Sequence, residues 1–150
     1  MQRAESSIRV AAPVSRVYEY WRNFENFPHF MQYVEEVRKN DADGQMSHWR
    51  IKGPLGISVE FDARLTQDEP NRSIGWNSTD GSVETTGNVT FSETDNNTLV
   101  HVVLNWYNPP GGAVGEAAAK VLYNPATMLD EDLKRFKEIV EGRATSRRVA

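Results

Sequence analysis

The three histidines are the first candidates for chemistry in this sequence, because an imidazole can hold a metal ion or move a proton near neutral pH. His48 and His101 alternate with apolar residues, which places both on the polar outer face of a predicted sheet, and His29 stands in an aromatic block. No two histidines have the spacing of a zinc-binding pair, and the chain has no cysteine. We therefore expect surface histidines and no metal site.

Glu60 and Asp62 are the candidate acid–base pair, since two carboxylates held close together in an apolar site can divide that work. They lie two residues apart on one predicted strand, so they share a face. That face is opposite the strand's apolar residues, and we expect it to be solvated, with Arg50 and Lys52 as cross-strand partners. No nucleophile elbow, phosphate loop, dinucleotide glycine run or zinc-protease helix motif occurs. The sequence therefore assigns no catalytic residue and predicts no cofactor.

Tyrosine hydroxyls are the remaining polar groups that could serve an apolar cavity, because a phenol can orient a ligand carbonyl. Tyr123 is the most interesting of them, one helical turn before Pro125. The competing interpretation is an ordinary amphipathic tyrosine at a rim. The other candidates are Tyr18, Tyr33 and Tyr107.

Hydrophobic periodicity predicts the elements that must position these side chains. From Val34 to Trp106 apolar and polar residues alternate, in six segments that turn residues separate. Strands joined by such short connections pair antiparallel. A short strand over Ser6–Val10, an amphipathic helix over Pro13–Arg22 and two helical turns interrupted by Pro28 precede them.

The period changes to 3.6 residues from Ala113 to Gly142, which predicts one long C-terminal helix. Pro125 removes a backbone hydrogen bond inside this helix and should kink or split it. The chain has 150 residues, the size of one domain, which we place at residues 1–142. Residues 143–150 form a basic C-terminal tail that we expect to be disordered.

Four segments spread along the chain carry patterns that occur together in one superfamily. They are a first helix at Ala12–Trp21, an aromatic-Pro-x-Phe-Met block in Phe24–Met31, a last strand at Thr98–Leu104 that Pro109–Gly112 follow, and a helix ending at Asp132–Lys137. In these segments the sequence resembles the polyketide cyclase/dehydrase proteins of the START-like (SRPBCC) superfamily, which also include coenzyme Q-binding START proteins.

This resemblance implies an α+β helix-grip fold. A curved antiparallel sheet of about seven strands would wrap around the long C-terminal helix, with two short helices after the first strand. The resemblance implies binding or transport of a small hydrophobic ligand, such as a lipid, an isoprenoid quinone or a polyketide. Two alternatives stay open: a polyketide cyclase or dehydratase-type enzyme, and a protein-interaction module such as a ribosome-associated factor. The fold alone does not decide between them.

A ligand cavity follows from this architecture, because one helix laid across a concave sheet is too narrow to fill the hollow. Ala117–Ala119 make the helix thinner still. Large apolar side chains on such a frame would line a cavity, the usual setting of an apolar ligand, although each of them alone also suits an ordinary core. The predicted ligand-binding residues are Phe27, Phe30, Met31, Trp49, Phe61, Trp76, Phe91, Trp106, Val121, Tyr123 and Met128.

The composition of the chain restricts the classes of partner and the cellular compartment that we expect. The formal net charge is −4, whereas domains that grip nucleic acid are usually basic, so we expect no nucleic-acid partner. No stretch is apolar enough for a membrane span or a signal peptide, and the absence of cysteine fits a reducing compartment. We expect a cytoplasmic protein whose partner is a small hydrophobic molecule. The sequence leaves the oligomeric state open.

Overall fold

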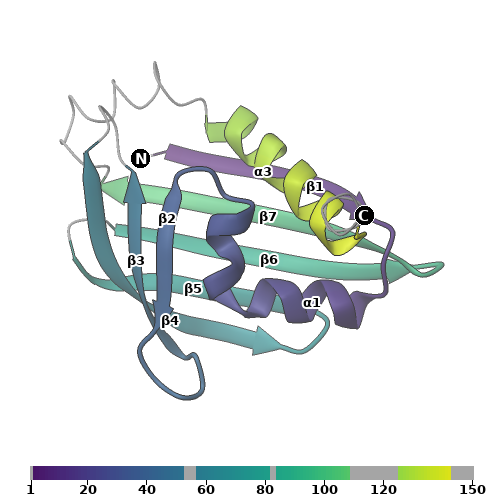
Figure 1. Cartoon of the computed structure of the whole chain (residues 1–150), viewed down its shortest axis with the longest axis horizontal. Helices are drawn as coiled ribbons and strands as arrows, with labels where there is room; N and C mark the ends of the chain where they lie inside the picture. The colour runs from purple at the N-terminus through teal and green to yellow at the C-terminus, as the bar shows by residue number, and fades with distance from the viewer. Residues whose placement is uncertain (1, 53–56, 82–83, 109–124, 143–150) are drawn as a thin grey trace.

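The computed structural model describes residues 2–52, 57–81, 84–108 and 125–142 (Figure 1). Seven strands, two α-helices and one 3-10 helix lie in these ranges. In chain order they are β1 (Gln2–Val10), α1 (Val14–Arg22), the 3-10 helix η1 (Phe24–His29), β2 (Val34–Lys39), β3 (Met46–Lys52), β4 (Ser58–Glu69), β5 (Ser73–Gly81), β6 (Glu84–Thr94), β7 (Asn97–Asn108) and α3 (Pro125–Val140).

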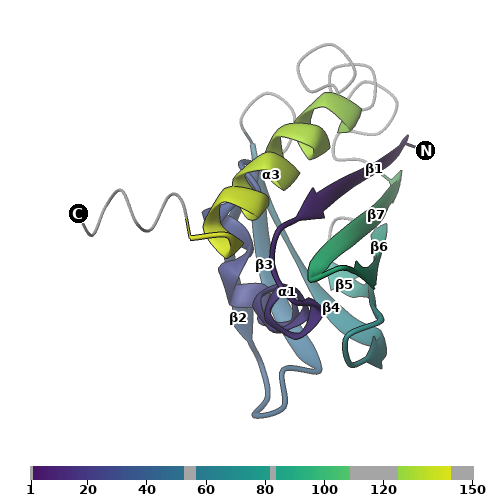
Figure 2. The same cartoon turned by 90° about the vertical axis from the view of Figure 1, so that its right-hand side faces the viewer.

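The seven strands form one antiparallel sheet in the order β1-β7-β6-β5-β4-β3-β2. The sheet is curved, and α1, η1 and α3 lie against its concave face (Figures 1 and 2). This arrangement confirms the predicted α+β helix-grip fold. β1 begins at Gln2, four residues before the predicted start, because its hydrogen bonding to β7 extends back to the pair Gln2–Trp106.

Strand alternation decides which side chains face the helices. Along β4, Phe61, Ala63 and Leu65 are buried, while the residues between them are exposed or half-buried. This is the period-two pattern of a strand with one solvated face, as the sequence predicts. The concave face is called the inner face below, and the solvated face is called the outer face.

The helices bury one stripe each. Val17 and Trp21 are the buried residues of α1, and Leu133 and Phe136 lie on the buried side of α3. The C-terminal helix ends at Val140, and Gly142 in the turn that follows has a φ of 82°, which suits a residue without a side chain. The first part of the predicted helix, residues 113–124, and the basic tail, residues 143–150, lie outside the described residues. Within the described residues, no helix is both long and apolar enough to cross a membrane.

Candidate ligand site

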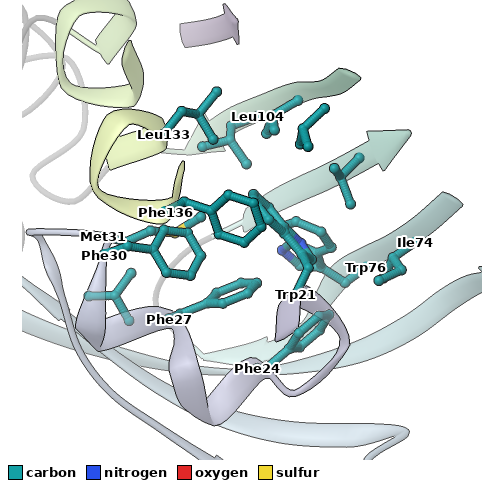
Figure 3. Packing of buried hydrophobic residues seen from close by; sticks show 14 of the residues in the cluster. Trp21, Phe24, Phe27, Phe30, Met31, Ile74, Trp76, Leu104, Leu133 and Phe136 are labelled. Carbon is teal, nitrogen blue, oxygen red and sulfur yellow. The ribbon is translucent and has the colours of Figure 1, made fainter. Parts of the chain in front are cut away.

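An aromatic cluster fills the space under α1 and η1. Trp21 is fully buried, with its ring centroid 5.4 Å from that of Phe27 and 5.1 Å from that of Phe136 on α3. Figure 3 shows these rings packed edge to face and tilted against one another. Such contacts stabilise a core beyond the area they bury. The aromatic cluster comprises Trp21, Phe24, Phe27, Phe30, Trp49, Trp76 and Phe136.

A pocket lies beside this cluster, between the inner face of the sheet and the segment that follows η1. Its interior is narrow: the volume open to a water-sized sphere is about 20 Å³, room for about one water molecule. A larger ligand must therefore displace side chains when it binds. The pocket is lined by Met31, Tyr33, Val34, Trp49, Ile51, Phe61, Trp76, Thr85, Leu104 and Trp106.

The structure brings together five of the eleven residues that the sequence predicts at the ligand site. Trp49 and Phe61 stack across β3 and β4, with ring centroids 5.4 Å apart and planes 24° from parallel. The indole of Trp49 is fixed by a 2.8 Å hydrogen bond that its Nε1 donates to Ser47 Oγ. The five predicted residues that line the pocket are Met31, Trp49, Phe61, Trp76 and Trp106.

The other predicted residues lie elsewhere or outside the description. Phe27 and Phe30 belong to the aromatic cluster. Phe91 is buried on β6, where the edge of the Tyr18 ring meets it at 6.0 Å. Met128 is half-buried on α3 and is not part of the pocket lining. Val121 and Tyr123 lie outside the described residues.

Four pocket residues were missed at the level of sequence: Val34, Ile51, Thr85 and Leu104. Ile51, Thr85 and Leu104 occupy inner-face positions that the alternation assigns correctly, whereas Val34 lies at an irregularity in the β2–β3 pairing, where the alternation breaks. The prediction favoured rings over aliphatic side chains. Thr85 is also the one hydroxyl on the sheet side of the pocket, and it donates a 2.6 Å hydrogen bond to Asn105 O.

Tyr33 supplies the second polar group of the pocket. Its ring packs against Trp106 with centroids 6.0 Å apart. Burial, and then the nearby charge of Asp132, raise the pKa of the Tyr33 phenol, so this group stays protonated at neutral pH. A protonated phenol can donate a hydrogen bond to a ligand oxygen.

Asp132 is a buried carboxyl group on α3, next to the pocket residue Tyr33. It is 0% exposed; Oδ1 accepts hydrogen bonds from the Gln32 backbone amide, at 3.3 Å, and from the Arg135 guanidinium. Oδ2 has no hydrogen-bond partner among the described residues. Burial raises the pKa of Asp132 to about 6, although the Gln32 amide and Arg135 act in the opposite direction. The sequence held a signal for it, an aspartate within the apolar stripe between Leu129 and Phe136.

The predicted acid–base pair lies on the outer face, away from the pocket. His48 stands between Glu60 and Asp62, with Nε2–Oε1 and Nδ1–Oδ1 distances of 2.6 and 2.7 Å. The hydrogen bonds to Glu60 and Asp62 raise the pKa of His48 above its ordinary value, and the bond to His48 lowers the pKa of Glu60. Arg50, one of the two expected cross-strand partners, lies opposite Glu60 in the β3–β4 register and helps to lower its pKa. The Arg50 guanidinium also lies 3.6 and 3.5 Å from Glu35 and Glu36.

The remaining candidates serve the fold. His101 Nε2 lies 2.7 Å from Glu5 Oε2, which ties β7 to β1 on the outer face, and His29 is exposed. Tyr18 donates its hydroxyl to Asp68, and burial together with this contact raises the pKa of Tyr18 to about 12. No group of three or more possible ligands that could hold a metal ion occurs within the described parts of the chain.

A curved antiparallel sheet with a C-terminal helix against its concave face, and an apolar pocket on that face, defines the class of helix-grip domains. Residues 10–134 match the family described as "Polyketide cyclase / dehydrase and lipid transport". The chain belongs to this family. Its sequence is 32% identical over 143 residues to an uncharacterised 17.2 kDa protein of Streptomyces lincolnensis, a match that covers 95% of this chain and 92% of the relative.

Solved structures of similar proteins share the fold over nearly the whole chain. A protein of Deinococcus radiodurans superposes with a TM-score of 0.75 at 28% identity, covering 94% of this chain and 98% of the other. An aromatase/cyclase from a Streptomyces species gives a TM-score of 0.72 at 18% identity, with 95% of each chain covered. A START superfamily protein from Mycobacterium smegmatis gives 0.68 at 17% identity, covering 93% of this chain and 97% of the other.

Proposed function

We propose that the protein binds and carries a small hydrophobic molecule in the pocket between the sheet and the segment after η1. The single observation that carries this proposal is the pocket lining, in which eight of ten side chains are apolar and the other two, Tyr33 and Thr85, offer hydroxyl groups. Burial of ligand surface would supply most of the affinity, at roughly 25 cal/mol per Å². A lipid, an isoprenoid quinone or a polyketide-like molecule would suit such a lining.

Family membership supports the same proposal, since the family description includes lipid transport. We place the carrier in the cytoplasm, because a cysteine-free chain suits a reducing compartment. With a formal net charge of −4, it would not bind nucleic acid.

Binding of N-phenyl-1-naphthylamine, a neutral fluorophore that brightens in apolar surroundings, tests this function. Leu104→Trp would fill the pocket from β7 and weaken probe binding about tenfold or more, a loss of about 1.4 kcal/mol. Leu99→Trp is the matched control, the same substitution on the exposed outer face of the same strand, and should leave binding unchanged. Absence of probe binding, or equal binding by both variants, would refute the assignment of the pocket.

A second candidate function, a cyclase or dehydratase-type enzyme, is favoured by the raised pKa of Asp132 beside the protonated phenol of Tyr33. Such perturbed groups next to a pocket are typical of acid–base sites. The similar fold of the Streptomyces aromatase/cyclase is in keeping with this candidate. Cyclisation of a poly-β-keto thioester by the wild type, lost in Tyr33→Phe, would support it; no turnover would leave a carrier.

The interaction-module alternative predicts a filled interior and a sizeable exposed apolar patch. The narrow pocket is in keeping with the first of these, so the patch decides. Among the described residues, three large apolar side chains are exposed: Ile57, Leu99 and Tyr107. Leu99 and Tyr107 are eight residues apart on β7. Ile57 precedes β4, and two strands, β5 and β6, lie between β4 and β7. They form no continuous patch, so we do not favour this alternative.

A further inference from the structure

We propose that occupancy of the pocket is linked to protonation of Asp132, so that a hydrophobic ligand and a proton bind together and leave together. This inference rests on the proposed function and adds its regulation. The proton would come from solvent and reside on Oδ2, the oxygen without a partner among the described residues. No other bond needs to form or break.

The geometry connects the carboxyl group to the pocket through one short piece of chain, residues 30–33. Arg135 donates from Nε to Phe30 O at 3.0 Å, and Asp132 accepts from the Gln32 amide at 3.3 Å. The two residues that alternate with these, Met31 and Tyr33, line the pocket. The backbone of this segment is therefore held by the ion pair of α3, while its side chains form one wall of the ligand site.

The charged surroundings of Asp132 come from two elements. On α3 these are Arg135, which is paired with it, and Glu131, which also accepts from Gln32 Nε2 at 3.4 Å. From residues 30–33 they are the Gln32 amide and the phenol of Tyr33.

The other elements that pack on α3 contact different residues of the helix. The β1 contacts join Ser6 to Asp130, the Arg9 carbonyl to Lys137, and the Ala11 amide, just after the strand, to Glu141. The α1 contacts are those of the Tyr20 and Trp21 rings with the Phe136 ring. Asp132 therefore has one close cationic partner within the described residues, too few to hold the pKa of this buried carboxyl at its ordinary value.

Ligand binding should make the charged form still less favourable. The pocket has room for about one water molecule, and an apolar ligand bound there would keep solvent water away from the side of Tyr33. Loss of nearby water raises the free energy of a buried carboxylate relative to its acid. The pKa of Asp132, already about 6, would then rise, and by linkage protonation would tighten ligand binding equally.

The experiment measures binding of N-phenyl-1-naphthylamine to the full chain from about pH 5 to about pH 8, a range in which the probe stays neutral. We expect wild-type affinity to be about fivefold or more higher at the acid end. Calorimetry in two buffers of different ionisation enthalpy should show net proton uptake on binding near pH 6.5 in the wild type. Asp132→Asn should bind the probe with neither the pH dependence nor the proton uptake.

Asp130→Asn is the matched control, since it changes an exposed aspartate of the same helix that contacts Ser6 rather than the pocket segment. It should keep both the pH dependence and the proton uptake. A pH dependence that persists in Asp132→Asn would overturn the inference and point to another titrating group. Probe binding that does not change with pH would overturn it while leaving the carrier function intact.

Absence of probe binding at every pH would refute the carrier function itself, and this inference with it. If Asp132→Asn does not fold, carbon-13 NMR of the wild-type carboxyl groups gives the same answer. We expect the pKa of Asp132 to rise when the probe binds. An unchanged pKa would overturn the inference.

Discussion

Gly87 and Trp76 lie directly opposite each other on β6 and β5, and the indole occupies the space that a side chain at Gly87 would need. A Cβ at Gly87 would lie well inside the contact distance of the Trp76 ring. Trp76 in turn lines the pocket and packs on the aromatic cluster. The glycine therefore sets the position of a ring that serves both the core and the ligand site.

Gly87→Ala should destabilise the protein by about 1–3 kcal/mol, because overpacking forces the indole or the strand to move. Urea denaturation measures this loss, and probe binding should weaken with it. Gly75→Ala is the control one residue from Trp76: its new Cβ would meet Thr66 Oγ1 at 3.0 Å, on an exposed side chain that can turn away. Equal losses in the two variants would show that the indole contact is not the cause.

Asp132→Asn should flatten the pH dependence of stability. The folded pKa of about 6 lies above the ordinary value of 3.8, so protonation of this carboxyl favours the folded state. Its stabilising contribution is complete below about pH 4 and is lost as the pH rises through 6. The wild type should therefore lose about 1–3 kcal/mol relative to Asp132→Asn between pH 4 and 7. Urea denaturation at several pH values measures it, and a difference that does not change with pH would contradict the burial argument.

His48 should titrate above its ordinary range, and Glu60→Gln should lower its pKa because the hydrogen bond to Glu60 is the largest cause of the shift. Since the folded pKa is raised, the stability that His48 contributes is complete below about pH 6.5 and is lost as the pH rises through the folded pKa. Proton NMR of the imidazole follows both variants directly. Asp62→Asn should lower the pKa of His48 by less than Glu60→Gln does. A larger decrease would show that the hydrogen bond to Asp62 is the stronger cause.

Phe136→Ala should cost about 3–5 kcal/mol of stability, because it leaves a cavity beside Trp21 and Phe30 in the aromatic cluster. Ile139→Ala, on the same helix but half-buried, should cost less. Thermal unfolding compares the two. A similar loss in both would indicate that the cluster relaxes around the missing ring.

The sequence predicts the fold well because its alternation is regular. Phe61, Ala63 and Leu65 fall on one face of β4 in the sequence and in the structure, and the same logic orders the neighbouring strands. Short turns then leave antiparallel pairing as the one simple topology.

The site is harder to predict, because whether a buried side chain lines a pocket or fills the core depends on the packing of the whole molecule. Phe27 and Phe30 are the large apolar residues expected in a cavity wall, yet their rings fill the interior by packing on Trp21 and Phe136. The resulting hollow is smaller than the number of aromatic residues suggests, and it lies at one end of the sheet's inner face. Asp132 is not predicted from the sequence because an aspartate on a helix is ordinarily a surface residue.

The pairing of β1 with β7 has a consequence for the synthesis of the chain. Residues 2–10 leave the ribosome well before their partner strand, which spans residues 97–108, and α3, which packs along β1, follows later still. At about 5–20 residues per second, the first strand waits several seconds for its neighbour. This edge of the sheet therefore closes only after translation has passed two thirds of the sequence, and until then its unsatisfied amide and carbonyl groups must be kept from pairing with other nascent chains.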